Sequence, residues 1–371
     1  MDHSSTSEIY LGMMSGTSLD GIDVVAVDFR DHPPRLLGHY HGEMPPQLRH
    51  QLYQIALDQP LPVSQLGAVT TELAEQYASC TNTLCQRLKL PVAHIQALGC
   101  HGQTVFHQPS GEHPFSLQLN NPSLIAAKTG ITTVADFRSK DLALHGQGAP
   151  LVPAFHQALF ADSQQTTIVL NIGGIANISV LQPGQPTLGY DTGPGNMLMD
   201  SWIQHHLAQP FDQDGQWAAS GQTLPHLLTQ LLATPYLALP PPKSTGRELF
   251  HLDWLRQYLT GQESAADVQA TLLAFTAISI THEVDRYACG RLLVCGGGAH
   301  NRALMEQLQQ QLPNWKVQST DQVGISADMM EAMAFAWLAR QTMLHRPGNL
   351  TDVTGASRPA ILGGIFLADP L

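Results

Sequence analysis

The sequence predicts an α/β protein made of two domains. Its 371 residues are 43% hydrophobic and 13% charged, which is enough apolar material for a large core that divides in two. Two segments, 9–28 and 168–181, each read as a strand, a glycine-containing turn and a second strand. A third segment, 291–312, is a strand followed by three glycines and a helix. Glycine turns of this kind let a phosphate or a flat ring approach the main chain.

Composition and charge exclude several classes of protein. The formal net charge of -12 argues against a nucleic-acid partner. The five cysteines show no CxxC spacing, which is typical of a reducing cytoplasm. No apolar run is long enough for a membrane span, and the first residues lack the pattern of a signal peptide, so we expect no membrane and no export. The eighteen histidines are scattered, which indicates surface or core positions rather than a metal centre.

The first hairpin has a composition that can wrap phosphate oxygens. Its strands, 9–14 and 22–29, flank a turn in which Gly16 and Gly21 free the backbone. Because the carboxylate of Asp20 would repel a bare phosphate, it predicts a bridging divalent cation or a sugar hydroxyl. Neither a Walker loop nor a GxGxxG fingerprint occurs in the chain. An ordinary hairpin with a polar tip is the alternative.

Polar side chains follow two more predicted strands, 95–100 and 132–135. Ligands of α/β sheets bind at the carboxyl ends of strands, so His101 and Gln103, after the first strand, are candidates to hydrogen-bond a sugar. A capped turn is the alternative for both. Arg138, after the second strand, is a candidate to grip a substrate carboxylate by a bidentate contact. Long helices are predicted over 63–90 and 152–160, and the chain is expected to cross between domains near 136–147.

The second hairpin carries the leading candidate site. Gly173 and Gly174 turn the chain between two apolar strands. Asp191 follows in the stretch YDTGPGN, which is too rich in glycine and proline to continue as helix or strand. A helix is predicted from Met197. This segment therefore offers a glycine turn for a phosphate and a carboxylate on a rigid loop, although two ordinary turns with a solvated aspartate would give the same pattern.

Three features in the last third of the chain complete the pattern. Lys243 and Arg247 lie in a proline-rich loop that is expected to be a solvated surface loop, with an approach to nucleotide phosphates as the alternative. Glycines 296–298 join a strand to a helix and leave room for a flat ring or a phosphate. Glu331 is the interior carboxylate of an apolar helix predicted over 327–340, where it lies either at a solvated edge or facing a cleft.

In their order, these segments resemble the phosphate-1, phosphate-2, adenosine and connecting-helix elements of the superfamily of acetate and sugar kinases, heat-shock chaperones and actin. The residues within these segments resemble the motifs of the anhydro-N-acetylmuramic acid kinases still more closely. This resemblance runs from Ile9 to about Gly364. Asn171 differs from the wider superfamily, in which many members place an aspartate before the paired glycines, so no metal contact is expected there. The matching stretches are 14–23, 100–104, 135–138, 146–153, 171–177, 190–196, 296–301 and 328–337.

The resemblance implies a fold and an activity. The fold would be two ribonuclease H-like, actin-like ATPase domains around a central ATP cleft. The first domain would comprise 1–135 and 348–371, and the second, 136–347, would carry the adenosine site. The activity would be that of a cytoplasmic enzyme of cell-wall recycling, which uses ATP and water to open the 1,6-anhydro ring of anhydro-N-acetylmuramic acid. The products would be N-acetylmuramic acid 6-phosphate and ADP, with Mg²⁺ bridging the phosphates.

The resemblance also assigns roles to residues. Asp191 matches the family's catalytic aspartate and would deprotonate the attacking water, and Glu331 is the second catalytic candidate. Asp20 is the implied protein contact of Mg²⁺. The implied sugar-binding residues are His101, Gln103, Asp136 and Arg138. The implied ATP-binding residues are Gly16, Thr17, Ser18, Leu19, Asp20, Gly21, Ile22, Asp23, Gly173, Gly174, Gly296, Gly297, Gly298 and Asn301.

Two other functions remain open. One is a kinase of a different sugar or acid on the same fold, which would phosphorylate an ordinary hydroxyl without consuming water. The other is a non-enzymatic, actin-like scaffold switched by nucleotide. Polar strand ends and a base-like loop favour an enzyme, since a filament needs neither. The expected partners are a small sugar and ATP, and a homodimer is left open.

Overall fold

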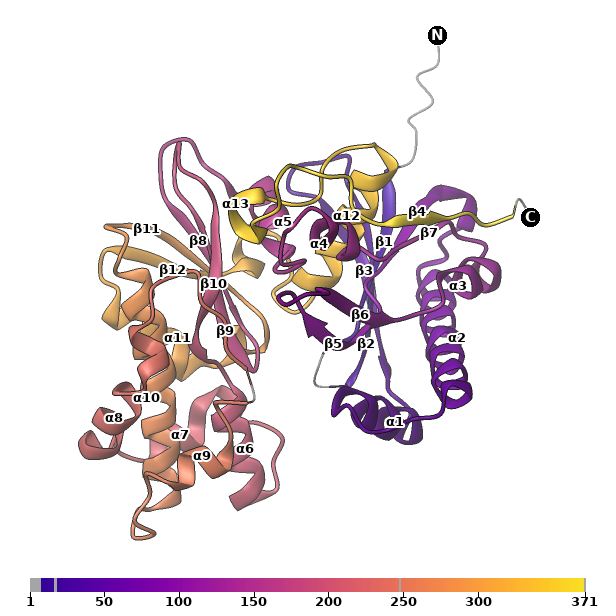
Figure 1. Ribbon diagram of the computed structural model, residues 1–371. Coiled ribbons are helices and arrows are strands. Elements are labelled where there is room, and N and C mark those ends of the chain that lie inside the picture. Colours follow the sequence, from indigo (N-terminus) through magenta and orange to yellow (C-terminus); the bar gives the residue numbers. More distant parts are fainter. Residues whose placement is uncertain (1–7, 17–18, 247, 370–371) are drawn as a thin grey trace. The chain divides into compact units, whose positions relative to one another are not determined.

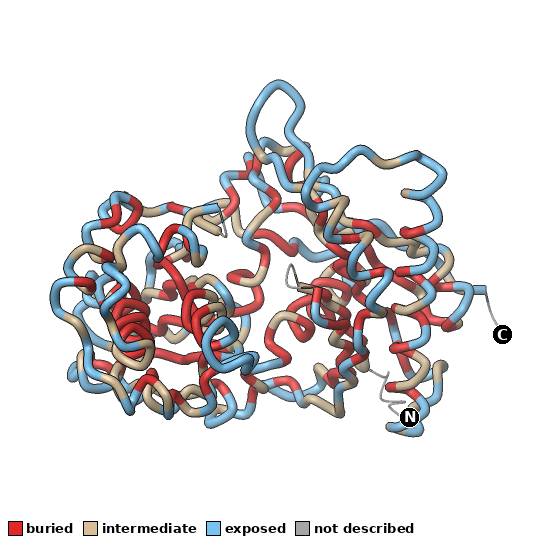
Figure 2. Tube along the Cα trace, turned by 90° about the horizontal axis from the view of Figure 1, so that it is seen from below, coloured by how far each residue is buried: buried red, intermediate tan, exposed pale blue. Residues whose placement is uncertain are grey.

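The computed structural model describes residues 8–16, 19–246 and 248–369 (Figure 1). This part of the chain forms two compact units. Unit 1 contains the described residues up to Phe155 and from Met329 onward, and unit 2 is His156–Asp328. Each unit has its own sheet and its own hydrophobic core, with buried residues along its interior strands and helices (Figure 2). The predicted α/β class and the presence of two domains are therefore confirmed.

Unit 1 is built on a six-stranded sheet with the order β13-β7-β4-β1-β2-β3. Strands β1, β2 and β3 form an antiparallel meander, β4 and β7 continue the sheet in parallel with β1, and β13 pairs antiparallel with β7. A separate hairpin of β5 and β6 was not predicted. The bounds are β1 Ile9–Met14, β2 Gly21–Asp28, β3 Arg35–Glu43, β4 Ile95–Cys100, β5 Gln103–Gln108, β6 Phe115–Leu119, β7 Thr133–Ala135 and β13 Gly364–Phe366.

Side chains alternate between the two faces of the sheet along each strand of unit 1. Helices pack on both of these faces. Leu11 and Met13 of β1 share one core with α2, whereas Gly12 between them faces α12. A Cβ at Gly12, or at Gly99 of β4, would overlap the main chain of α12. The missing side chains therefore let α12 lie directly on the sheet. The helices are α1 Pro46–Ala56, α2 Val63–Leu88, η1 Val92–His94, α3 Pro122–Thr129, α4 Ser139–Ala143, α12 Met330–Met343 and α13 Thr351–Thr354.

Unit 2 repeats this plan in a five-stranded sheet with the order β10-β9-β8-β11-β12. Its first three strands form an antiparallel meander, and the last two are parallel to β8. Both units thus place three meander strands beside two parallel strands, so the ribonuclease H-like topology predicted for each domain is confirmed. The bounds are β8 Thr167–Ile172, β9 Ile175–Leu181, β10 Leu188–Pro194, β11 Gly290–Cys295 and β12 Trp315–Ser319.

The centre of unit 2 is α10, a helix that is buried along most of its length. It contacts α6, α7, α8, α11 and β10, and its apolar residues join the core of the unit. The described helices here are α6 Met197–Leu207, η2 Gln213–Gly215, α7 Gln216–Ser220, α8 Pro225–Leu232, η3 Pro235–Ala238, α9 Leu252–Arg256, α10 Ala265–Val284, η4 Gly297–His300, α11 Arg302–Gln311 and η5 Thr320–Val323, and α5 Val152–Phe160 begins in unit 1.

The division between the units differs from the predicted one. The stretches 136–155 and 329–347 were expected in the second domain, but both belong to unit 1. Packing between distant segments explains the difference. The α12 helix lies on β1 and β4, and the buried carboxylate of Asp141 accepts hydrogen bonds from Asn349 at 2.7 Å and from Thr354 at 2.8 Å.

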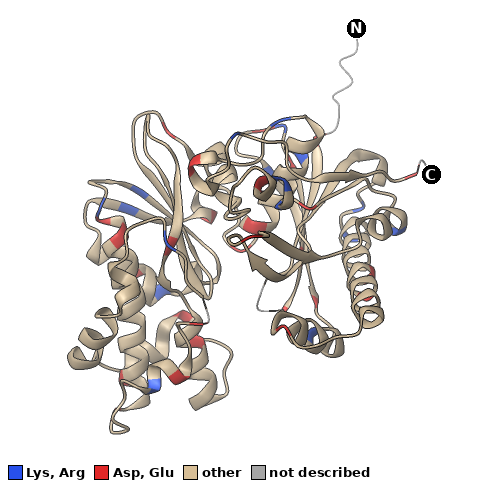
Figure 3. Cartoon of the chain, in the orientation of Figure 1, with Lys and Arg blue, Asp and Glu red and all other residues tan. Residues whose placement is uncertain are grey.

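Charged side chains are sparse and dispersed over both units (Figure 3). Lysine and arginine total 18, against 30 aspartates and glutamates. Among the helices of the described residues, none is both long and apolar enough to cross a bilayer. The absence of a nucleic-acid partner stays a prediction.

Candidate active site

Asp191 lies in strand β10 and not in the predicted turn. β10 is an edge strand, and its register with β9 shifts between Asp191 and Gly193, which marks a bulge. The segment Lys243–Thr245, here called the strap, binds the outer edge of β10. The Asp191 amide donates to the Lys243 carbonyl at 3.0 Å, and the Thr245 amide donates to Asp191 Oδ2 at 3.0 Å. The turn prediction was wrong because pairing with β9 continues the strand through Pro194.

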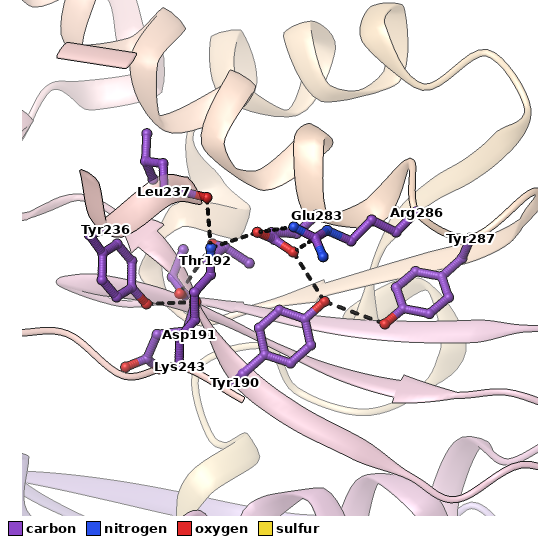
Figure 4. A network of polar contacts seen from close by, with 10 residues as sticks. Tyr190, Asp191, Thr192, Tyr236, Leu237, Lys243, Glu283, Arg286 and Tyr287 are labelled. Carbon is purple, nitrogen blue, oxygen red and sulfur yellow. Dashed lines mark hydrogen bonds and ion pairs between the residues drawn. The ribbon is translucent and has the colours of Figure 1, made fainter. Parts of the chain in front are cut away.

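The surroundings of Asp191 raise its pKa. Burial raises the pKa of this carboxyl to about 6, the Thr245 amide lowers it, and the Glu248 carboxylate raises it. The Tyr236 hydroxyl donates to the Asp191 carbonyl at 2.8 Å, and burial raises the pKa of that phenol as well (Figure 4). A carboxylate with a pKa near 6 is ionised at neutral pH yet can accept a proton in a transition state. Asp191 therefore has the protonation behaviour of a general base.

The turn between β8 and β9 leaves its main chain open. Gly173 and Gly174 lack a positive φ, and a Cβ at either would meet no described atom closer than 3.6 Å outside its chain neighbours. Their carbonyl oxygens bind the loop before α6, because the Asn196 amide donates to Gly173 at 2.8 Å and the Gly195 amide to Gly174 at 2.9 Å. Neither backbone strain nor packing among the described residues therefore requires these two glycines, and the open space suits a phosphate.

A cavity of about 400 Å³ lies within unit 2, beside the first turn of α6 and the η4 turn. Of glycines 296–298, Gly297 lines it, and the one described atom within 4 Å of a Cβ there, chain neighbours aside, is Asn196 Nδ2 at 3.8 Å. Gly296 has a φ of +77°, and a Cβ at Gly298 would overlap the Ile172 side chain. Glycine at these two positions therefore serves local packing. The lining residues are Asn196, Met199, Asp200, Phe211, Asp212, Gln213, Asp214, Gly297, His300 and Asn301.

Carboxylates give this cavity its polar character. Burial, with a smaller effect of Asp212, raises the pKa of Asp200 to about 7. Asp212 accepts from the amides of Trp217 and Ala218, each at 2.9 Å, and so fixes the start of α7. The predicted residue Asn301 caps α11 by accepting from the Leu304 amide at 3.1 Å. Carboxylates suit ligand hydroxyls and amino groups and disfavour phosphates, so this cavity suits the nucleoside part of a nucleotide.

Sequence reasoning missed the part of the cavity that residues 211–214 provide. They lie between α6 and α7, with η2 at Gln213–Gly215, and match none of the motifs considered. The one available signal was the FDQDG stretch, where two carboxylates precede a glycine. Gly215 has a φ of +67°, which turns the chain so that the carboxylates are held beside the cavity.

Arg138 in unit 1 is held in a fixed orientation. Its Nε and Nη2 donate to His101 Nε2 at 3.2 and 2.8 Å, and its Nη1 donates to the Gly148 carbonyl at 2.8 Å. The His101 ring packs on Phe335 with ring centroids 4.6 Å apart. Burial lowers the pKa of Arg138 to about 10 and, together with Arg138 itself, holds the pKa of His101 well below its usual range. Neutral His101 therefore orients a cationic Arg138, and direct contact of His101 with a sugar stays a prediction.

Glu331 in the first turn of α12 belongs to the same group. Burial raises the pKa of Glu331, Arg138 lowers it, and Asp23 raises it. Asp23 in turn pairs with His41 at 2.8 Å. Glu331 is only partly buried, so its two alternatives, a solvated edge and a cleft, both stay predictions. The predicted sugar contact Asp136 is exposed, and its Oδ1 accepts from the Ser139 amide at 3.2 Å, which fixes the start of α4.

The first glycine turn is only partly described, because Thr17 and Ser18 lie outside the described residues. The Leu19 amide and the Gln103 side-chain amide both donate to the Gly16 carbonyl at 3.2 Å. Gln103 thus braces the turn, and its predicted sugar contact is not tested. The side chains of Leu19 and Ile22 lie in the core of unit 1, so a ligand at these residues would meet their main chain. Gly21 begins β2, and Asp20 before it is exposed.

Lys243 does not lie on a solvated loop. Its side chain is 3% exposed and pairs at 2.7 Å with Glu283, which is 1% exposed. The prediction of an exposed lysine was wrong because the partner, near the end of α10, is remote in the sequence. Arg247 lies outside the described residues. Among the residues described, no group of three or more His, Cys, Asp or Glu side chains is placed to hold a metal ion.

The topology of both units and the open glycine turn define a two-domain ATPase of the actin-like class. A family model described as anhydro-N-acetylmuramic acid kinase matches residues 8–368. The anhydro-N-acetylmuramic acid kinase of Aliivibrio fischeri is 53% identical over 366 residues, covering 98% of this chain and 100% of that protein. That of Vibrio vulnificus is 52% identical and covers 98% and 99%. This chain belongs to the anhydro-N-acetylmuramic acid kinase family, which confirms the resemblance noted in the sequence.

Proposed function

We propose that the protein is a cytoplasmic, ATP-dependent kinase of cell-wall recycling. It opens the 1,6-anhydro ring of anhydro-N-acetylmuramic acid with water and phosphorylates O6, giving N-acetylmuramic acid 6-phosphate and ADP. Family membership over residues 8–368 is the observation that carries this proposal. The half-buried carboxylate of Asp191, whose pKa is raised to about 6, supports it, because ring opening by water needs a base.

The proposed reaction uses one water and one ATP. Asp191 takes a proton from the water as the water oxygen bonds to the anomeric carbon, C1. The bond between C1 and O6 breaks, and O6 takes the γ-phosphoryl group as its bond to the β-phosphate breaks, so that ADP leaves. Asp191 then returns its proton to solvent. Because the phosphoryl group takes up the charge that develops on O6, no separate acid is needed for the leaving oxygen.

The nucleotide is proposed to bind unit 2 through two features. The cavity at Gly297 would hold the adenosine, with apolar contact from Met199 and Phe211 and with Asp200 facing hydroxyl or amino groups. The main chain at Gly173 and Gly174 would face the phosphates. The volume of about 400 Å³ is of the size that small-molecule sites have.

The sugar is proposed to bind unit 1 at Arg138. The substrate is an acid, and an arginine held by His101 and Gly148 keeps a fixed direction for a bidentate contact with a carboxylate. Glu331 lies in the same electrostatic environment and would accept a hydrogen bond from a sugar hydroxyl.

Magnesium is proposed to accompany ATP. When bound, Mg²⁺ would neutralise charge that develops on the transferred phosphoryl group. Such an ion usually keeps several waters and uses one or two carboxylates. The exposed carboxylate of Asp20 and the absence, among the described residues, of a larger ligand cluster fit an ion held mainly by phosphates and water.

Turnover in oxygen-18 water tests this function directly. We expect mass spectrometry of the product to find one label at the anomeric oxygen and none in the phosphate, because water attacks C1. The anomeric label exchanges with solvent, so early time points are compared with unlabelled product incubated without enzyme. Label in the phosphate, or ring opening with ADP alone, would overturn the mechanism. Phosphorylation of an ordinary hydroxyl without label would favour a kinase of another sugar.

Replacing Gly297 by valine should weaken ATP binding by about tenfold or more, because the branched side chain fills space that a ligand needs. The measurement is the Kd of ATP by calorimetry. Gly67 of α2 provides the matched control, since a Cβ there meets no described atom within 4 Å and Gly67→Val should leave the Kd unchanged. An unchanged Kd in Gly297→Val would remove this cavity from the nucleotide site.

A further inference from the structure

The strap is anchored behind Asp191 by a buried ion pair. Lys243 Nζ lies 2.7 Å from Glu283 Oε1 and donates to the Leu237 carbonyl at 3.1 Å (Figure 4). The same ammonium lies 5.1 Å from the centre of the Tyr236 ring. The side chains of Lys243 and Glu283 are 3% and 1% exposed. Such burial is costly for both charges, so a pair of this kind is weak evidence for a role in stability alone.

Glu283 is held from its other side as well. Its Oε2 lies 2.8 Å from Arg286 Nε and accepts from the Tyr190 hydroxyl at 3.3 Å (Figure 4). The Tyr190 hydroxyl also lies 3.4 Å from that of Tyr287. Tyr190 directly precedes Asp191 in β10, so the network touches this strand at a second point. The carboxylate of Glu283 is therefore a fixed anchor on α10.

One residue of the strap connects this anchor to Asp191. The Lys243 side chain reaches Glu283, and its carbonyl accepts the Asp191 amide at 3.0 Å. Two residues further on, the Thr245 amide donates to the Asp191 carboxylate at 3.0 Å. β10 is an edge strand of the sheet, so among the described residues no further strand fixes this side of Asp191. The geometry thus makes the strap the link between a buried ion pair and the candidate base.

We propose that Lys243 and Glu283 are positioning residues for the reaction: their ion pair holds the strap, and the strap holds the carboxylate of Asp191 toward its water. The inference rests on the proposed role of Asp191 as base. It goes beyond that role because neither residue touches a reacting atom. A pair that only stabilised the fold would leave turnover unchanged once the lost stability was restored.

The first test compares Lys243→Met with the double variant Lys243→Met, Glu283→Gln. Methionine keeps the apolar stem, and glutamine keeps one oxygen, which can accept from both Arg286 and Tyr190. The single variant should have a lower Tm, because it leaves Glu283 buried without one of its cations, and the double variant should recover much of that loss. In both variants kcat should be about 10–100-fold lower than in the unmodified protein, because a displaced base reacts slowly even when the fold is stable.

The pH dependence of kcat distinguishes a positioning role from a purely structural one, because loss of stability alone would not change it. The Thr245 amide lowers the pKa of Asp191, while Glu248 raises it, and the Tyr236 phenol is neutral in the assay range. Loss of the strap contact should therefore raise the pKa of Asp191 and move the acid limb of kcat to higher pH in both variants. Lys243→Arg keeps a cation and should return the limb toward its original position.

Arg291→Met is the matched control in unit 2. Arg291 donates to the Thr167 hydroxyl at 2.8 Å and to the Phe160 carbonyl at 3.0 Å, so its loss should lower Tm without changing kcat or the acid limb. The proposal is overturned if the double variant recovers kcat together with Tm, or if kcat falls while the acid limb stays in place. An active Asp191→Asn protein would instead overturn the proposed role of Asp191 itself.

Discussion

Replacement of Asp191 by asparagine should lower kcat by about 10²–10⁴-fold, the usual contribution of a general base. Asparagine keeps the size of the side chain and an oxygen for the Thr245 amide, but it cannot take a proton from water. The measurement is ATP turnover on the anhydro sugar, with the Kd of ATP and of sugar followed in parallel and expected to stay unchanged. In the unmodified protein, turnover should fall as the pH drops below about 6, because the base becomes protonated.

Thermal unfolding separates this effect from damage to the fold. The pKa of Asp191 is raised from 3.8 to about 6 in the folded protein, mainly by burial. Its protonation therefore contributes stability that is fully present below pH 3.8 and is lost as the pH rises through about 6. Uncharged asparagine avoids the cost of a partly buried charge, so Tm at neutral pH should be equal or higher. Near-normal turnover in this variant would move the role to another group, with Glu331 next.

Replacement of Arg138 by methionine should raise the KM for the anhydro sugar by about 10–100-fold. Hydrogen bonds to charged groups contribute about 1.5–3 kcal/mol, and about 1.4 kcal/mol corresponds to a factor of ten. Methionine retains the apolar stem but removes the guanidinium that His101 and Gly148 orient. The measurement is steady-state kinetics with sugar varied at saturating ATP.

Two controls accompany the Arg138 variants. Arg138→Lys restores a charge without the planar fork and should recover only part of the KM. The Kd of ATP should be unchanged in both, because the proposed adenosine cavity lies within unit 2. An unchanged KM for the sugar would assign its carboxylate to another residue.

Local patterns in the sequence were sufficient for much of the fold. The hairpin tip at Gly173–Gly174, the helix from Met197 and the strand that ends at Cys295 were all predicted close to their observed bounds. Each depends on residues that are neighbours in the chain, such as a short apolar run, a glycine or a periodic helix face. The two ribonuclease H-like sheets follow from the order of these elements together with the family resemblance.

Features that depend on distant contacts were not predictable in this way. The outer edge of Asp191 is bound by the strap, and Lys243 is buried because Glu283 lies on α10. The α12 helix belongs to unit 1 because Gly12 and Gly99 admit its main chain. In each case the deciding partner is far away in the sequence, where neither propensity nor periodicity carries information about it.

The glycines of this chain divide into two kinds that matter differently to a protein engineer. At Gly12, Gly99 and Gly298, neighbouring atoms already fill the space that a side chain would need. These glycines are therefore part of the scaffold and cannot be redesigned. Gly173 and Gly297 face space, because a Cβ there would meet no described atom closer than 3.7 Å outside the chain neighbours. Side chains introduced at these two positions could reshape ligand preference while the scaffold is inherited unchanged. Glycine in this chain thus serves two purposes: at some positions it is required for packing, and at others it leaves room beside a ligand.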